Sequence, residues 1–245
     1  LDGAMGGGLY QGKTYGIAGA EKAGKTMLAH TISYNLNERG VNHAYIALEM
    51  GSDEIEQRNV ARKAGINSLQ FLSNDVHDRE DVKDKIIKHT GNVKPNTWYL
   101  DMPGSNIGEI KGELARLVVK KQITGFILDY WQLVEGKSKG ETEEAFMRNV
   151  AQQLANFAKR HNVWCIITAQ LNDNGELFGG KGLKKACSQL YYMYNCEYGD
   201  GEPMPNNMWM RMDTTRYTPK CDLGGKNSPA FKINVQAGPH VMEAY

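Results

Sequence analysis

Gly19-Ala-Glu-Lys-Ala-Gly-Lys-Thr26 decides the fold of this 245-residue chain, because it satisfies every position of the pattern G-x-x-x-x-G-K-[ST]. A loop of this pattern joins a strand to a helix, and its backbone N–H groups converge on the phosphates of a nucleotide. The flanking sequence fits, with an apolar strand over 13–18 and apolar residues near helical spacing over 27–36. The alternative is a glycine-rich turn with a chance Gly-Lys-Thr, and the flanking strand and helix argue against it.

The phosphate loop assigns a chemical task to two of its side chains. Lys25 supplies a cation for the β and γ oxygens, and Thr26 supplies the hydroxyl that such loops use to hold Mg²⁺. The sequence therefore predicts a nucleoside triphosphate site. The nucleotide-binding residues predicted from the motif are Gly19, Ala20, Glu21, Lys22, Ala23, Gly24, Lys25, Thr26 and Met27.

Composition excludes several other classes of protein. With 41% hydrophobic and 23% charged residues the chain can bury a core. It contains no twenty-residue apolar run, so neither disorder nor a membrane span is indicated. A net charge of +1 argues against a broadly basic surface, so any nucleic-acid contact must be local. Cys165, Cys187, Cys196 and Cys221 have no metal-ligand spacing, which favours a reduced, cytoplasmic location. The first residue is Leu1, so we expect a fragment whose N-terminal domain is absent.

Apolar runs alternate with amphipathic stretches along most of the chain. This alternation predicts an α/β fold with a mostly parallel central sheet and helices on both faces. The predicted strands are 44–48, 97–100, 124–128 and 163–168, and the predicted helices are 52–63, 78–88, 105–121 and 141–161.

The pattern changes after residue 170. Residues 172–182 are rich in Gly, Asn and Asp and predict a mobile loop. Beyond the loop we expect strands over 190–195 and 207–213, then β segments at 230–235 and the C-terminus, which together form an antiparallel edge. With no linker in view, residues 1–245 are expected to form one domain.

A second carboxylate for the nucleotide site stands at the end of the apolar run Phe126-Ile-Leu-Asp129. Strand ends of an open α/β sheet meet at its ligand-binding edge, where Asp129 could hold Mg²⁺ through water. The alternative is an ordinary aspartate that starts a turn. The phosphate loop favours the Mg²⁺-associated role.

Glu49 and Gln170 end two further predicted strands at the same edge. Glu49 is a candidate base for the attacking water, or else a solvated charge near the N-terminus of the helix from Ser52. Both readings stay open from position alone. Gln170 could bond the γ-phosphate and report its loss to the following loop, although spacing alone favours an amide that satisfies loop backbone.

Three motifs in order make the chain resemble the DnaB-like replicative helicases, whose motor is a RecA-like P-loop NTPase core. Leu48-Glu-Met50 matches the family's Leu-Glu-Met, Leu128-Asp-Tyr-Trp-Gln-Leu133 its Asp-Tyr-x-Gln-Leu, and Ala169-Gln-Leu-Asn172 its Gln-Leu-Asn. Leu9-Tyr-Gln-Gly12 is similar to the family's entry into the motor domain. The resemblance covers almost the whole chain.

The resemblance carries several implications for function. It implies an ATP- and Mg²⁺-dependent helicase of phage or plasmid type, which forms a hexameric ring of identical chains. Such a ring translocates 5′ to 3′ on single-stranded DNA and binds a primase or a helicase loader. Within the site, the resemblance implies Glu49 as catalytic carboxylate, Asp129 as the Mg²⁺-associated aspartate and Gln170 as γ-phosphate sensor.

Two stretches depart from the family pattern. In Asp213-Thr-Thr-Arg216, Arg216 falls where the family's arginine finger reaches a neighbouring subunit, but Thr214 replaces a lysine. The alternative for Arg216 is a turn arginine bonded to nearby carbonyls. In the stretch 179–185 we expect single-stranded DNA to be gripped by backbone N–H groups around Gly182 and by lysine side chains, or else a solvated lysine cluster on a flexible loop. The DNA-binding candidates are Lys181, Gly182, Lys184 and Lys185.

These departures keep two rival functions open. One is a RecA/KaiC-like ATPase that forms filaments or signalling rings. The other is a DNA-binding or loading partner without unwinding activity, in which ATP only controls assembly.

Overall fold

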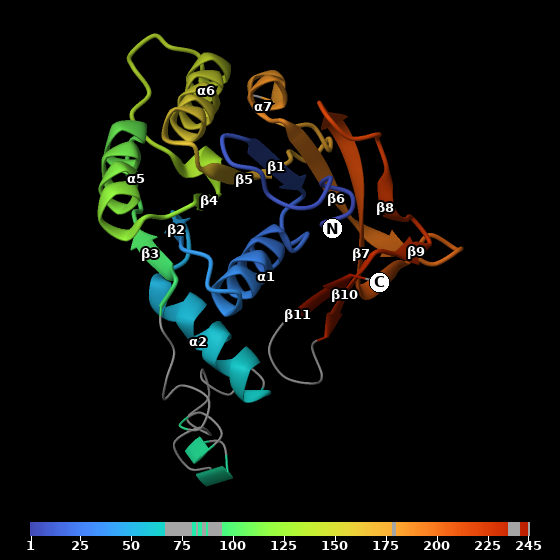
Figure 1. Ribbon diagram of the computed structural model, residues 1–245. Helices are drawn as coiled ribbons and strands as arrows, with labels where there is room; N and C mark the ends of the chain where they lie inside the picture. Colours follow the sequence, from blue (N-terminus) through green and yellow to red (C-terminus); the bar gives the residue numbers. More distant parts are fainter. Residues whose placement is uncertain are drawn as a thin grey trace.

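A layer of strands with a parallel centre runs through the molecule (Figure 1). The computed structural model describes residues 1–66, 80–81, 83–84, 87, 95–177, 180–234 and 241–244. The described strands hydrogen-bond in the order β11-β10-β7-β6-β1-β5-β4-β2-β3, with β8 paired to β7 and β9 to β8. Their bounds are β1 (Thr14–Gly19), β2 (His43–Ala47), β3 (Thr97–Asp101), β4 (Gly125–Asp129), β5 (Trp164–Gln170), β6 (Gln189–Glu197), β7 (Pro203–Thr215), β8 (Asp222–Gly225), β9 (Ser228–Pro229), β10 (Phe231–Asn234) and β11 (Val241–Ala244).

The carboxyl ends of the parallel strands meet at one edge of the sheet. Gly19 of β1 lies opposite Gln170 of β5, and Ala47 of β2 lies opposite Asp129 of β4. This is the edge at which open parallel sheets bind ligands. β6 also runs parallel to β1, whereas β7, β10 and β11 are antiparallel. The predicted α/β fold with antiparallel C-terminal strands is confirmed.

Helices cover both faces of the sheet, as predicted (Figure 1). On one face, Leu28 of α1 and Ile55 of α2 join a buried cluster with Ile127 of β4. On the other face, Leu114 of α5 and Leu154 of α6 belong to a second buried cluster. The helices are α1 (Lys25–Glu38), α2 (Ser52–Ala64), α5 (Ile107–Lys121), α6 (Glu143–His161) and α7 (Gly180–Ala186), with a short 3-10 helix η2 (Trp131–Leu133).

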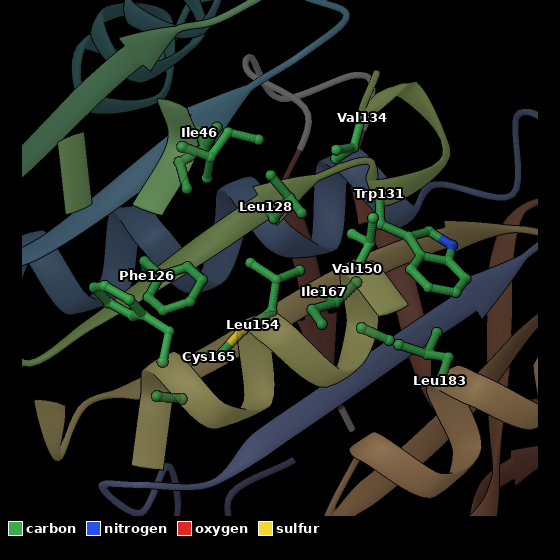
Figure 2. Packing of buried hydrophobic residues seen from close by; sticks show 14 of the residues in the cluster. Ile46, Phe126, Leu128, Trp131, Val134, Val150, Leu154, Cys165, Ile167 and Leu183 are labelled. Atoms are coloured by element: carbon green, nitrogen blue, oxygen red, sulfur yellow. The ribbon is translucent and has the colours of Figure 1, made fainter. Parts of the chain in front are cut away.

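The local sequence explains why α6 forms where it does. Thr142 caps it, since the side chain of this residue accepts a hydrogen bond from Ala145 N at 3.2 Å. Val150 and Leu154 then recur at helical spacing and point into the cluster that holds Leu128 of β4 (Figure 2). Burying one such side chain contributes about 1.5–3 kcal/mol. The apolar stripe therefore fixes α6 against the sheet.

Two boundaries differ from the predictions. The helix predicted over 105–121 begins at Ile107 as α5, because Asn106 caps it and forms a reciprocal capping box with Glu109. The predicted mobile loop over 172–182 is wrong at its end, since residues 180–186 form α7. The predicted helix over 78–88 lies mostly outside the described residues.

Two further findings concern the whole of the described chain. None of its helices is both long and apolar enough to cross a membrane. All four cysteines are free thiols.

Candidate nucleotide site

The phosphate loop joins β1 to α1 at the ligand-binding edge. Gly24 has φ of 80°, a left-handed conformation that favours glycine, and α1 begins at the next residue. The carbonyl of Gly24 accepts a hydrogen bond from the N–H of Leu28 at 2.9 Å, so the helix starts directly from the loop. The side chain of Lys25 is folded back, and its Nζ donates to Ala20 O at 2.6 Å.

A cavity of about 480 Å³ opens beside the loop and brings several predicted residues together. Lys25 and Thr26 line it from α1, Glu49 from the segment after β2, and Gln170 from the end of β5. Glu49 thus faces the phosphate loop and lies outside the first turn of α2, whose acidic residues are Asp53 and Glu54. The complete lining is Glu21, Lys22, Gly24, Lys25, Thr26, Met27, Glu49, Met50, Arg58, Tyr130 and Gln170.

Charge is concentrated around Lys25. Burial lowers the pKa of the Lys25 ammonium, and the negative charges of Asp129, Glu49 and Glu21 oppose this shift. Only 8% of the residue is exposed. A buried cation surrounded by carboxylates is suited to binding a polyanion together with a metal ion, because a metal ion offsets the repulsion between carboxylates and phosphates.

Asp129 lies at the end of β4, and only 6% of it is exposed. Tyr45 donates to its Oδ2 at 2.8 Å, and Thr168 donates to its Oδ1 at 2.5 Å. Both donors are neutral hydroxyls, so they bring no positive charge to the carboxylate. Together with the Thr26 hydroxyl it offers the hard oxygen ligands that Mg²⁺ prefers.

The rest of the described chain fits the way in which Mg²⁺ is usually held. No group of three or more His, Cys, Asp or Glu residues in those parts could form an all-protein metal cage. Mg²⁺ usually binds through one or two protein oxygens together with nucleotide phosphates. Thr26 and Asp129 are the residues of this site that could hold such an ion.

A side-chain amide fixes the backbone of Gln170. Nε2 of Gln132 donates to Gln170 O at 2.7 Å, and Gln170 N donates to Oε1 of Gln132 at 3.1 Å. Gln132 belongs to η2, which follows Asp129 closely along the chain. The ends of β4 and β5 are thereby tied together next to the cavity.

Three lining residues of the cavity, Met50, Arg58 and Tyr130, were missed from the sequence, although Met50 lies inside the quoted motif around Glu49. Arg58 reaches the cavity from α2 and forms an ion pair with Glu54 at 2.7 Å, and Tyr130 lines it directly after Asp129. Arg58 is nine residues beyond Glu49 on an ordinary polar helix, so no local motif marks it. Tyr130 lies inside the quoted motif around Asp129, and this position was the available signal.

Arg216 lies far from this cavity, at the opposite edge of the sheet. β7 runs antiparallel to β6 and ends with Thr215 opposite Gln189, which in turn lies opposite Tyr15 near the start of β1. The guanidinium of Arg216 donates to the carbonyl of Lys185. Arg216 therefore bonds a nearby carbonyl, as in the alternative reading, and it does not reach the phosphate loop of its own chain.

The DNA-binding candidates lie on α7 rather than in a loop. A Cβ on Gly182 would lie 2.6 Å from Cα of Arg148, so Gly182 packs closely against α6. Lys181, Lys184 and Lys185 are all exposed, and Lys184 forms an ion pair with Asp213 of β7 at 2.8 Å. The loop that does follow Gln170 closes through a bridge between residues 171 and 177.

A phosphate loop at the edge of a mostly parallel sheet, with carboxylates from two other strand ends beside it, defines a RecA-like P-loop ATPase domain. The chain belongs to the family of DnaB-like helicase C-terminal domains, whose family profile matches residues 1–180. This range contains Lys25, Glu49, Asp129 and Gln170, whereas Arg216 lies beyond it.

Individual relatives agree with this family. The chain is 24% identical over 173 residues to the replicative DNA helicase DnaB of Rickettsia bellii (strain RML369-C), covering 66% of the chain and 34% of the relative. It is 26% identical over 174 residues to DnaB of Leifsonia xyli subsp. xyli (strain CTCB07), covering 69% and 37%. The chain thus spans about a third of the length of the curated relatives it matches.

Solved structures support the same fold. The ATPase domain of G40P aligns with a TM-score of 0.77 at 20% identity, over 87% of this chain and 81% of that one. A DnaB-like replicative helicase, studied for its interactions with primase, aligns with a TM-score of 0.78 at 19% identity, over 88% and 55%. At this identity the likeness establishes the fold alone.

Proposed function

We propose that this domain is the ATP-hydrolysing motor of a DnaB-like replicative DNA helicase. The observation that carries the proposal is the convergence of Lys25, Thr26, Glu49 and Gln170 on one cavity, with Asp129 held beside it. Phosphoryl transfer depends mainly on positioning and on stabilising charge, and these side chains supply both.

Each residue has a proposed task. Lys25 and the N–H groups of the phosphate loop bind the β- and γ-phosphates of ATP. Glu49 takes a proton from the attacking water, and Gln170 bonds the γ-phosphate and reports its loss to the loop that follows. Arg58, which faces the same cavity, adds a second cation to the site.

Thr26 and Asp129 are the residues that would hold Mg²⁺, Asp129 through water. The ion, when bound, neutralises charge on the phosphates. Glu49 is exposed at the cavity, so it can contact solvent and the γ-phosphate together.

A neighbouring copy completes the site in this proposal. Because Arg216 lies at the opposite edge of the sheet from Lys25, it can serve only a neighbour's nucleotide. An arginine supplied in trans stabilises the transferring phosphoryl group. We propose a hexameric ring with ATP between subunits, through which single-stranded DNA moves 5′ to 3′ past the lysines of α7.

The wider setting follows from the family and remains part of the proposal. The chain would act in the cytoplasm, in the host cell if it is phage- or plasmid-encoded, and residues 1–245 would form one domain. A primase or a helicase loader would be its protein partner.

A fork-unwinding assay with and without ATP tests the function, with Lys25→Ala run beside the unmodified chain. Strand displacement that requires ATP and is lost in Lys25→Ala supports the motor. DNA-stimulated ATP hydrolysis without displacement favours the RecA/KaiC-like or loading rivals. An unmodified chain that neither binds nor hydrolyses ATP would overturn the proposal.

A further inference from the structure

Two buried hydroxyls hold the carboxylate of Asp129 from different strands. Tyr45 of β2 reaches Oδ2 at 2.8 Å, and Thr168 of β5 reaches Oδ1 at 2.5 Å while also contacting Leu128 O at 3.2 Å. Tyr45 and Thr168 are both 0% exposed. β2 and β5 flank β4 in the sheet, so the two donors grip Asp129 from opposite sides.

This arrangement fixes the orientation of the carboxylate without neutralising it. One hydrogen bond would leave the group free to rotate about its Cβ–Cγ bond, whereas a bond to each oxygen sets the plane. A carboxylate oxygen can accept more than one hydrogen bond, so Asp129 retains acceptor capacity toward the nucleotide. An arginine in place of the two hydroxyls would have cancelled the charge.

The side chain of Tyr45 is completely buried beneath the nucleotide site. Its ring lies 6.0 Å from the ring of Tyr99 between centroids, so packing also restrains the side chain. The donor of the Asp129 bond is thus held in place by packing.

We propose that Tyr45 and Thr168 are positioning residues that orient Asp129 for the Mg²⁺ that accompanies the nucleotide. The inference rests on the proposed nucleotide site, because it assigns Asp129 to the metal. Outer hydrogen-bond partners of metal-associated groups usually affect affinity by about 10–100-fold. Since Asp129 is expected to act through water, we expect an effect at the lower end of this range.

The test measures how nucleotide binding depends on Mg²⁺, with no turnover involved. A fluorescent non-hydrolysable ATP analogue is titrated into each variant in excess Mg²⁺ and in EDTA, and Mg²⁺ is then titrated at fixed nucleotide. In Tyr45→Phe the Mg²⁺ midpoint should rise on the order of tenfold, with affinity in EDTA unchanged. Thr168→Val should behave in the same way, and Thr168→Ser, which keeps the hydroxyl, should restore the midpoint.

Tyr191→Phe is the matched control. It also removes a buried phenolic hydrogen bond, from Tyr191 to Oε1 of Gln189 at 3.1 Å, but this bond lies on β6 and does not involve Asp129. Its Mg²⁺ midpoint should equal that of the unmodified chain. Circular dichroism confirms that each variant is folded, and the Thr168 pair decides the question if Tyr45→Phe does not fold.

The possible outcomes distinguish failure of the positioning role from failure of the proposed ATPase function. A folded Tyr45→Phe or Thr168→Val with an unchanged midpoint overturns the positioning role and leaves the ATPase proposal intact. An equal shift in Tyr191→Phe also overturns the role, because a general loss of stability would then explain the result. If the unmodified chain binds the analogue equally well in EDTA, the assignment of Asp129 to Mg²⁺ fails first.

Discussion

Lys25 and Arg216 lie at opposite ends of the strands of the same sheet. Lys25 follows the carboxyl end of β1. Arg216 follows β7, and the last residue of β7 pairs with the first residue of β6, which in turn pairs with a residue near the start of β1. No rearrangement of side chains alone can bring the two groups to one nucleotide within a single copy. The geometry leads directly to a complementation experiment.

Variants Lys25→Ala and Arg216→Ala should each lose ATP hydrolysis, and mixing them should restore part of it. In a random equal mixture, about a quarter of the interfaces pair an intact Lys25 with an intact Arg216. Steady-state phosphate release from each variant and from the mixture makes the measurement. Should Arg216→Ala alone hydrolyse ATP normally, Arg216 has no role in trans.

Glu49→Gln should bind ATP normally and hydrolyse it at least about a hundredfold more slowly, because an amide cannot accept the proton of the attacking water. Binding of an ATP analogue and single-turnover hydrolysis distinguish the two effects. Asp53→Asn, which removes an exposed carboxylate from the first turn of α2, is the control and should leave both unchanged. Equal losses in both variants would contradict a specific role for Glu49.

Gln132→Ala should weaken the link between nucleotide turnover and DNA. Removing the amide leaves the N–H and carbonyl of Gln170 without partners, which costs about 1–3 kcal/mol of unfolding free energy. We expect ATP binding to persist while stimulation of hydrolysis by single-stranded DNA falls. Chemical denaturation and ATPase assays with and without oligonucleotide test this expectation, with Gln153→Ala on α6 as control. Full DNA stimulation in Gln132→Ala would be the contrary result.

Freeing Lys184 from its ion pair tests whether α7 contacts DNA. Burial raises the pKa of Asp213, but hydrogen bonds from Lys184 and Thr214 and the charges of Lys184 and Lys220 outweigh it, so the net shift is downward. Asp213→Asn should tighten binding of a labelled oligo(dT) and steepen its salt dependence by up to about one unit of log–log slope. Fluorescence anisotropy at several salt concentrations measures both, with Asp222→Asn on β8 as control. If Asp213→Asn and Lys184→Ala both leave affinity unchanged, DNA is held elsewhere.

Stability should fall in mild acid because of two buried histidines. Burial lowers the pKa of His43 to about 4, partly opposed by the hydrogen bond between Nδ1 and Val41 O. Burial, together with the charges of Arg58 and Arg62, lowers the pKa of His30 to about 4. Between about pH 6.5 and 4 the unfolded chain binds protons that the folded chain excludes, so each histidine lowers the unfolding free energy by about 1.4 kcal/mol per pH unit.

Urea unfolding at pH 7, 6 and 5 measures this loss, and above about pH 6.5 these histidines add no pH dependence. His43→Gln should reduce the slope by about half, because one of the two titrating groups is gone. His43→Gln should also lower the unfolding free energy at neutral pH, because the hydrogen bond between Oγ of Ser33 and Nε2 of His43, 2.7 Å apart, is lost. A variant with the unchanged slope would rule His43 out as a source of acid sensitivity.

The nucleotide half of the site was predictable because its signals are local. The phosphate loop has fixed spacing, and Asp129 and Gln170 each end an apolar run, so a parallel sheet must bring them to one edge. The partners of Asp129 were not predictable, since Tyr45 and Thr168 are separated from it by 84 and 39 residues and meet it only through strand order. The same holds for Arg58, whose approach depends on how α2 lies against the cavity.

α7 shows where local signals pointed the wrong way. Gly180-Lys-Gly-Leu-Lys-Lys-Ala186 contains two poor helix formers, which favoured a loop. Tertiary packing overrides this preference, because the small Gly182 allows close approach to α6 and Leu183 is completely buried. The lysines are therefore presented from a fixed helix.

The antiparallel turn from β6 to β7 gives each copy two unlike ends. In the proposed ring, the phosphate-loop end of the sheet would receive a nucleotide and the opposite end would offer Arg216, so contacts between copies would be head to tail. In an assembly built this way, every subunit acts on the neighbour on one side and is acted upon by the neighbour on the other. All the arginine contacts would then point in the same rotational sense around the assembly, which a symmetric face-to-face pairing would not allow.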